Sequence, residues 1–190
     1  VVLSTNDSVL LLRAGAPGDP LTQIASMQFD YGSQPWSHNT RSVAIREIPG
    51  QGGSFEVLFN IGSQGNNTAS GSAVNVSGLV SAALNPDSVY RLTITDNGAS
   101  VSPASLVQIA SGLRNAFGLG FHPSGDVYIA ENGIDGLVDA NIPLSADELN
   151  VIPSAQVGAT VVNFGFPNHY VDYSTGTVIG SGGTLPIAAF

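Results

Sequence analysis

The sequence contains no cysteine and no lysine, and these absences limit what the protein can be. Without cysteine, the fold needs no disulfide. The basic residues are five arginines, at positions 13, 41, 46, 91 and 114, and the net charge is −9. Proteins that bind nucleic acid use lysine and arginine to displace counterions from phosphates. We therefore expect no nucleic acid as a partner, and no anionic membrane surface.

Long apolar runs are also missing, since no stretch approaches the roughly 20 residues of a membrane-spanning helix. The chain carries no signal peptide and starts at Val1, inside a predicted strand. We therefore expect a piece of a longer chain, a partial domain over residues 1–190 that is incomplete at both ends. The acidic, cysteine-free composition favours a secreted or periplasmic protein.

Charged residues are scarce, at 10% of the chain against roughly a quarter in an average soluble domain. Glycine is abundant, with 23 residues, and Ser, Thr, Asn and Val are frequent, which favours short strands and turns. Alternating apolar residues predict strands at residues 1–3, 9–13, 21–29, 43–48, 55–61, 88–95 and 106–110. The one helical candidate is a short turn at 145–149, which Ser145 would cap. The predicted fold class is therefore all-β.

A weak internal repeat refines this fold class. Residues 43–62 and 119–133 each consist of an apolar strand, a Pro/Gly turn, a second strand, and a glycine before a polar loop. Repetition of a whole strand–turn–strand unit, at a longer period than that of single strands, favours a β-propeller. Its four-stranded blades take roughly 40–45 residues each. The chain would then hold about four blades, and the closed ring of a propeller would need more sequence on both sides.

Three segments carry a resemblance to a known family: GLRNAFGLGFHPSGDVYIAENG at 112–133, ADELNVI at 146–152 and VNFGFP at 162–167. Together they resemble the glucose/sorbosone dehydrogenase family, which comprises soluble sugar dehydrogenases that depend on pyrroloquinoline quinone and fold as six-bladed propellers. Upstream, SHNTR at 37–41 is similar to the family segment that carries the catalytic base. The resemblance implies oxidation of an aldose or related sugar, with an external electron acceptor.

The resemblance also implies roles for individual residues. His38 would accept the proton of the sugar hydroxyl, and Arg114 and Asn115 would hold the carboxylates and quinone oxygens of the cofactor. The main-chain carbonyls of Gly133 and Ile134 would bind Ca²⁺, a cation that prefers oxygen ligands. Asp147 and Glu148 match carboxylates that support calcium in relatives.

The sequence departs from the family pattern in three places. Ala116 replaces the usual proline, the loop at 134–146 is closer in length to sorbosone- and pyranose-type relatives, and the later basic residues that grip the cofactor would lie beyond Phe190. The second of these departures leaves the sugar open.

Structural explanations stand beside the functional ones. His38 could be a solvated loop histidine, Arg114 could pair with Glu131, and Glu131, Asp135 and Asp139 could form a solvated acidic loop. His122 is expected to be a turn residue, and His169 has no assigned role. A second function, from another class, is a non-catalytic propeller that keeps the family scaffold for binding.

Overall fold

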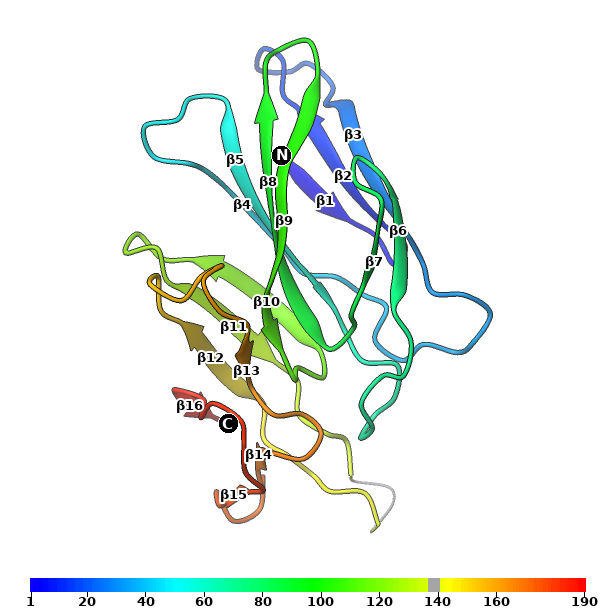
Figure 1. Ribbon diagram of the computed structural model, residues 1–190, viewed down its shortest axis with the longest axis vertical. Coiled ribbons are helices and arrows are strands. Elements are labelled where there is room, and N and C mark those ends of the chain that lie inside the picture. Colours follow the sequence, from blue (N-terminus) through cyan, green and yellow to red (C-terminus); the bar gives the residue numbers. More distant parts are fainter. Residues whose placement is uncertain (137–140) are drawn as a thin grey trace.

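The computed structural model describes residues 1–136 and 141–190, and these residues form strands, turns and loops without any helix (Figure 1). None of them belongs to a helix that could cross a membrane. The strands are β1 (Val2–Ser4), β2 (Ser8–Arg13), β3 (Thr22–Asp30), β4 (Val43–Glu47), β5 (Ser54–Ile61), β6 (Val74–Gly78), β7 (Ala82–Leu84), β8 (Ser88–Asp96), β9 (Val101–Ser111), β10 (Ala116–Phe121), β11 (Val127–Glu131), β12 (Glu148–Ile152), β13 (Val162–Asn163), β14 (Tyr170–Val171), β15 (Val178–Ile179) and β16 (Ala188–Ala189).

The strands of the described residues form three larger sheets and one small one. The first sheet has the order β1-β2-β3-β6-β7, the second β13-β9-β8-β5-β4 and the third β10-β11-β12-β16, while β14 pairs with β15 alone. Within the larger sheets all neighbours are antiparallel, except that β13 lies parallel to β9. In chain order the three larger sheets begin with β1, β4 and β10. These three strands are neighbours in space, since β4 contacts both β1 and β10. Sheets placed side by side around their first strands are the arrangement of propeller blades, so the predicted all-β propeller class is confirmed.

The second sheet lies between two apolar cores, which explains its near-continuous apolar sequence. On β5, Val57 and Phe59 belong to the core shared with the first sheet, whereas Leu58 belongs to the core shared with the third. Successive side chains of a strand point to opposite faces, so a strand that is covered on both faces needs apolar residues at odd and even positions alike. On β8, Leu92 and Val89 divide between the two cores in the same way.

The predicted strands are found with ends shifted by a few residues, and β9 begins earlier, at Val101. The helical turn predicted at 145–149 is wrong. Ser145 forms an isolated bridge with Asp172, and Glu148–Ile152 is β12, which pairs along its whole length with β11. Residues 148–152 form a strand because they lie along β11. A strand there gains a ladder of hydrogen bonds with β11, which an isolated helical turn would lack. The strands β6 and β7 were not predicted.

Two polar loops lie in the lower half of the molecule in Figure 1, one after β5 and one after β11. The loop after β5 is fastened at Ser70, whose main-chain N–H and hydroxyl both donate to the buried carboxylate of Asp87, at 2.9 and 2.7 Å. Asp87 in turn accepts the Leu113 N–H through its main-chain carbonyl, at 3.1 Å. The loop after β5 is therefore tied to the segment that leads into Arg114.

Candidate functional site

His38 lies in the loop between β3 and β4 and is held by Ser63, at the end of β5. The His38 Nδ1 atom is 2.9 Å from the Ser63 hydroxyl oxygen and 3.1 Å from the Ser63 carbonyl oxygen. The Ser63 hydroxyl donates its own hydrogen to the Gly65 carbonyl at 2.6 Å, so it accepts from His38. Both partners of Nδ1 are therefore acceptors, which assigns the proton to Nδ1 and leaves Nε2 as the basic nitrogen.

The electrostatic surroundings keep His38 neutral. Partial burial lowers the pKa of the imidazole below its ordinary value of 6.5, and the nearby Arg114 guanidinium lowers it further. The hydrogen bond to Ser63 and the Asp135 carboxylate act in the opposite direction but do not reverse the shift. A neutral imidazole with a free Nε2 has the form that a general base requires at neutral pH.

Arg114 is joined to His38 through the end of β5. The Ser63 N–H donates to the Arg114 carbonyl at 2.7 Å, and the His38 N–H donates to the Ser63 carbonyl at 3.2 Å. Gly62 lies where the two segments meet: a β-carbon there would stand 2.7 Å from both the His38 β-carbon and the His38 carbonyl oxygen. Only glycine allows so close an approach.

The Arg114 side chain is 4% exposed and is held by Asn66 and Asp135. Its Nε donates to the Asn66 carbonyl at 2.8 Å, and its Nη2 donates to the Asn66 amide oxygen and to the Asp135 carboxylate, both at 2.6 Å. The expected pairing of Arg114 with Glu131 takes another form, since Glu131 accepts the main-chain N–H of Arg114 instead of its guanidinium.

Asn115 follows Arg114 and is half-buried. Its amide nitrogen donates to the Asn132 side-chain oxygen at 3.1 Å, and its carbonyl accepts the Asn132 N–H at 3.0 Å. These bonds tie the segment before β10 to the segment after β11, so the hairpin between them fixes the separation of Arg114 and Gly133.

Gly133 and Ile134 form a wall between two cavities. On one side is an open pocket of about 250 Å³, which these two residues line together with Asp135 and Asp147. The Gly133 N–H donates to the Asp147 carboxylate at 2.8 Å, and the Ile134 carbonyl accepts the Ser145 N–H at 3.1 Å. A β-carbon on Gly133 would stand 2.3 Å from the Ser145 carbonyl oxygen, so this close approach also requires glycine.

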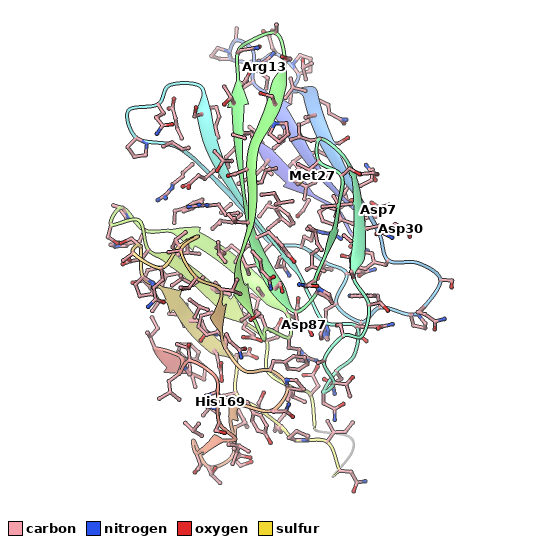
Figure 2. The ribbon with its side chains drawn as sticks, viewed as in Figure 1. Asp7, Arg13, Met27, Asp30, Asp87 and His169 are labelled. Atoms are coloured by element: carbon pink, nitrogen blue, oxygen red, sulfur yellow. The ribbon has the colours of Figure 1, made fainter. Side chains whose placement is uncertain are left out.

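On the other side is a smaller cavity of about 20 Å³, which has room for one water molecule. Its polar lining includes Arg114, Glu131, Glu148 and His169. Burial raises the pKa of Glu148 and raises that of Glu131 well above its ordinary value. His169, at the lower end of the molecule in Figure 2, is 8% exposed, and neither of its ring nitrogens finds a partner among the described residues.

The structure therefore brings together most, but not all, of the predicted residues. His38, Arg114 and Asn115 meet through the loop ends, and Gly133, Ile134 and Asp147 line the open pocket. Glu148 points the other way, into the smaller cavity, although it follows Asp147 directly.

Other residues take part in the site without having been singled out as functional: Asn66 and Ser63 as supports, and His169 in the smaller cavity. His122 is a turn residue as expected, since its Nδ1 accepts the Ser124 N–H at 3.2 Å. Asp139, expected in a solvated acidic loop, lies outside the described residues.

The residue types at the site suit a carboxylate ligand at Arg114 and a cation among oxygen ligands. The Arg114 guanidinium already holds one carboxylate, that of Asp135, through Nη2. No three acidic or histidine side chains within residues 1–136 and 141–190 could hold a metal ion together. Calcium in the open pocket would therefore depend on main-chain carbonyls, on Asp147 and on water, which are oxygen ligands that it accepts.

No protein-family model matches the sequence, and no curated protein matches it. Solved structures do resemble the fold. A Trichoderma reesei protein of carbohydrate-active enzyme family AA12, in its iodide and calcium structures, superposes with a TM-score of 0.54 at 20% identity. The holo form of the pyranose dehydrogenase PQQ domain from Coprinopsis cinerea superposes with a TM-score of 0.55 at 15% identity.

These comparisons cover most of this chain but less than half of each neighbour. The shared region is 92% of this chain and 42% of the Trichoderma protein, and 90% of this chain and 41% of the Coprinopsis domain. At such identities the likeness concerns the fold. The chain therefore shares its fold with part of a PQQ domain.

Proposed function

We propose that this chain forms part of a quinoprotein oxidoreductase that oxidises an aldose or a related sugar, with pyrroloquinoline quinone and Ca²⁺ as cofactors. The observation that carries the proposal is the pairing of a neutral His38, with Nε2 unprotonated, and a buried Arg114 in one loop cluster. The fold likeness to a PQQ domain and the motifs at 112–133 support the same assignment. The finer assignment, to the glucose/sorbosone type, rests on the motifs alone.

When bound, the quinone supplies the acceptor for a hydride, and calcium polarises it. The residues of this chain would orient the bound ligands and remove a proton from the sugar. His38 would take the proton of the sugar hydroxyl at Nε2, while Ser63 holds Nδ1–H and keeps the ring in place. Arg114 and Asn115 would hold ligand carboxylates and oxygens, and the carbonyls of Gly133 and Ile134, with Asp147, would face the cation.

The sugar would lose a hydride to the quinone and a proton to His38. An external acceptor would later remove two electrons from the reduced cofactor. We propose no role for nucleic acid or for a membrane, in line with the charge of −9 and the lack of lysine. We further propose that the protein works outside the cytoplasm, as a secreted or periplasmic enzyme.

The test is reconstitution of the full-length protein with Ca²⁺ and pyrroloquinoline quinone, followed by dye reduction with a panel of sugars. His38→Gln should lower the rate at least about a hundredfold, the usual contribution of a general base. His122→Gln, the same change at an exposed turn, is the matched control and should leave the rate unchanged.

Two results would count against the enzyme. If His38→Gln keeps the full rate, His38 is not the base. If the cofactor binds but no sugar is oxidised, the chain belongs to the alternative class, a propeller that binds without turnover.

A further inference from the structure

The ion pair between Arg114 and Asp135 is unusually asymmetric. The Arg114 side chain is 4% exposed, whereas that of Asp135 is 77% exposed. A buried guanidinium without an anion would be costly, but an exposed carboxylate gains little from the pair because water solvates it well. The pair therefore satisfies a need of Arg114 more than a need of Asp135.

Asn66 holds the main chain of Asp135 independently of this ion pair. The Asp135 N–H donates to the Asn66 amide oxygen at 3.1 Å, and the Asn66 amide nitrogen donates to the Asp135 carbonyl at 2.9 Å. The carboxylate of Asp135 can therefore leave Arg114 by rotation about side-chain bonds, while the loop and the Asn66–Arg114 contacts stay as they are.

We propose that Asp135 is an internal competitor, which occupies the Arg114 guanidinium until a ligand carboxylate replaces it. The inference rests on the proposed function in one respect: it takes Arg114 as the residue that grips a carboxylate of the cofactor. Exchange of one carboxylate for another keeps the buried guanidinium paired throughout. Asp135 meanwhile turns into solvent, where its charge is hydrated.

Occupation by Asp135 also makes the site selective. A neutral ligand gains nothing by approaching Arg114, because it would displace the Asp135 carboxylate and bring no negative charge to pair with the guanidinium. A ligand with a carboxylate aimed at Nη2 recovers the full interaction, and its affinity is reduced only by the strength of the internal pair. Removal of the internal carboxylate should therefore tighten the binding of such a ligand.

The experiment compares the affinity of the full-length protein and its variants for pyrroloquinoline quinone, by titration calorimetry in the presence of Ca²⁺. The principal variant is Asp135→Asn, which keeps the shape of the side chain and removes its charge. We expect binding tighter by about three- to fivefold, the size of a partly exposed ion pair expressed as a ratio of affinities. Asp135→Glu restores a carboxylate and should return the affinity towards that of the native chain.

A matched control separates this local effect from net charge. Asp19→Asn removes the same charge from the exposed loop between β2 and β3, at the opposite end of the molecule from the loop after β11 (Figure 1). At physiological ionic strength, charges so far apart are screened from each other. The control should therefore bind as the native chain does.

The outcomes distinguish the competitor role from the proposed function. Equal affinity of the native chain and Asp135→Asn overturns the competitor role and leaves the cofactor assignment standing. Weaker binding by Asp135→Asn also overturns it, since Asp135 would then support the ligand or its calcium ion. If neither protein binds the quinone, the cofactor assignment and the competitor role fail together.

Discussion

Replacement of Glu131 by glutamine should make the stability of the protein less dependent on pH. Glu131 is 6% exposed on β11, where one carboxyl oxygen accepts the Arg114 N–H and the other accepts the Asn150 amide at 3.3 Å. Burial raises its pKa well above the ordinary value of 4.5, and the neighbouring charge of Glu148, directly across the ladder, acts in the same direction.

The structure suggests how a neutral group would be accommodated at this position. The side-chain oxygen of Asn150 is buried and has no partner among the described residues. If the Asn150 amide is flipped, a protonated Glu131 donates to this oxygen while its other oxygen still accepts the Arg114 N–H. The glutamine side chain offers the same pair of groups, one donor and one acceptor, so Glu131→Gln imitates the protonated state.

The sign of the pH dependence follows from the raised pKa in the folded state. The contribution of Glu131 to stability is complete below the pKa of the unfolded chain, and it is lost as the pH rises through the folded-state pKa. Between these two values the native chain should lose up to about 1.4 kcal/mol per pH unit relative to Glu131→Gln.

The assay is urea unfolding from pH 5 to pH 8, followed by circular dichroism and by the fluorescence of Trp36, the single tryptophan. The quantity of interest is the difference in unfolding free energy between the two proteins at each pH, because Glu148 is present in both. Glu47→Gln makes the same substitution at an exposed position and reports the effect of one charge fewer. Parallel curves for the native chain and Glu131→Gln would refute the reasoning.

Two further predictions concern the ends of the hairpin and the base. In an NMR titration the His38 ring should show a pKa below 6.5, because it is partly buried beside Arg114. Asp135→Asn should lower this pKa further by removing a negative charge. A pKa at or above 6.5 would contradict the surroundings described for the imidazole. Gly133→Ala should destabilise the protein by about 1–3 kcal/mol, the usual cost of overpacking, because its β-carbon would press on the main-chain carbonyls of Ser145 and Ala146. Gly120→Ala, where no atom lies within 4 Å of the added carbon, is the control and should change the melting temperature little; equal losses in the two variants would show that the close approach at Gly133 is unimportant.

The scaffold of the site could be predicted from sequence because its signals are local. The alternation of apolar residues in β10 and β11 and the turn at His122 define a hairpin without reference to the rest of the chain. That hairpin sets the separation of Arg114 from Gly133. By contrast, the meeting of His38 with Arg114 depends on the end of β5, and the sequence indicated it only through the family resemblance.

The contacts of Arg114 could not be predicted because they depend on where two loops end in space. Asn66 is 48 residues from Arg114 along the chain, and no periodicity links them. The expectation that Glu131 lies in a solvated acidic loop is wrong, because Glu131 is the last residue of β11, is buried and lines the smaller cavity. Its burial depends on the strands that pair around it, whereas Asp135, a few residues later, is indeed exposed.

The strand β12, in place of the predicted helical turn, separates the neighbouring carboxylates Asp147 and Glu148, to which the family resemblance gave one role. On a helical turn, consecutive side chains diverge by about 100°, and both carboxylates could lean towards one ion. At the start of a strand they point to opposite faces, and here the Asp147 carboxylate accepts the Gly133 N–H, while Glu148 accepts the N–H of Val171, on β14 of another sheet, at 3.2 Å. The two carboxylates therefore separate, and Asp147 lines the open pocket with Gly133 and Ile134. Glu148 lines the smaller cavity with Glu131 and His169, and burial raises its pKa, while its role in calcium binding stays a prediction.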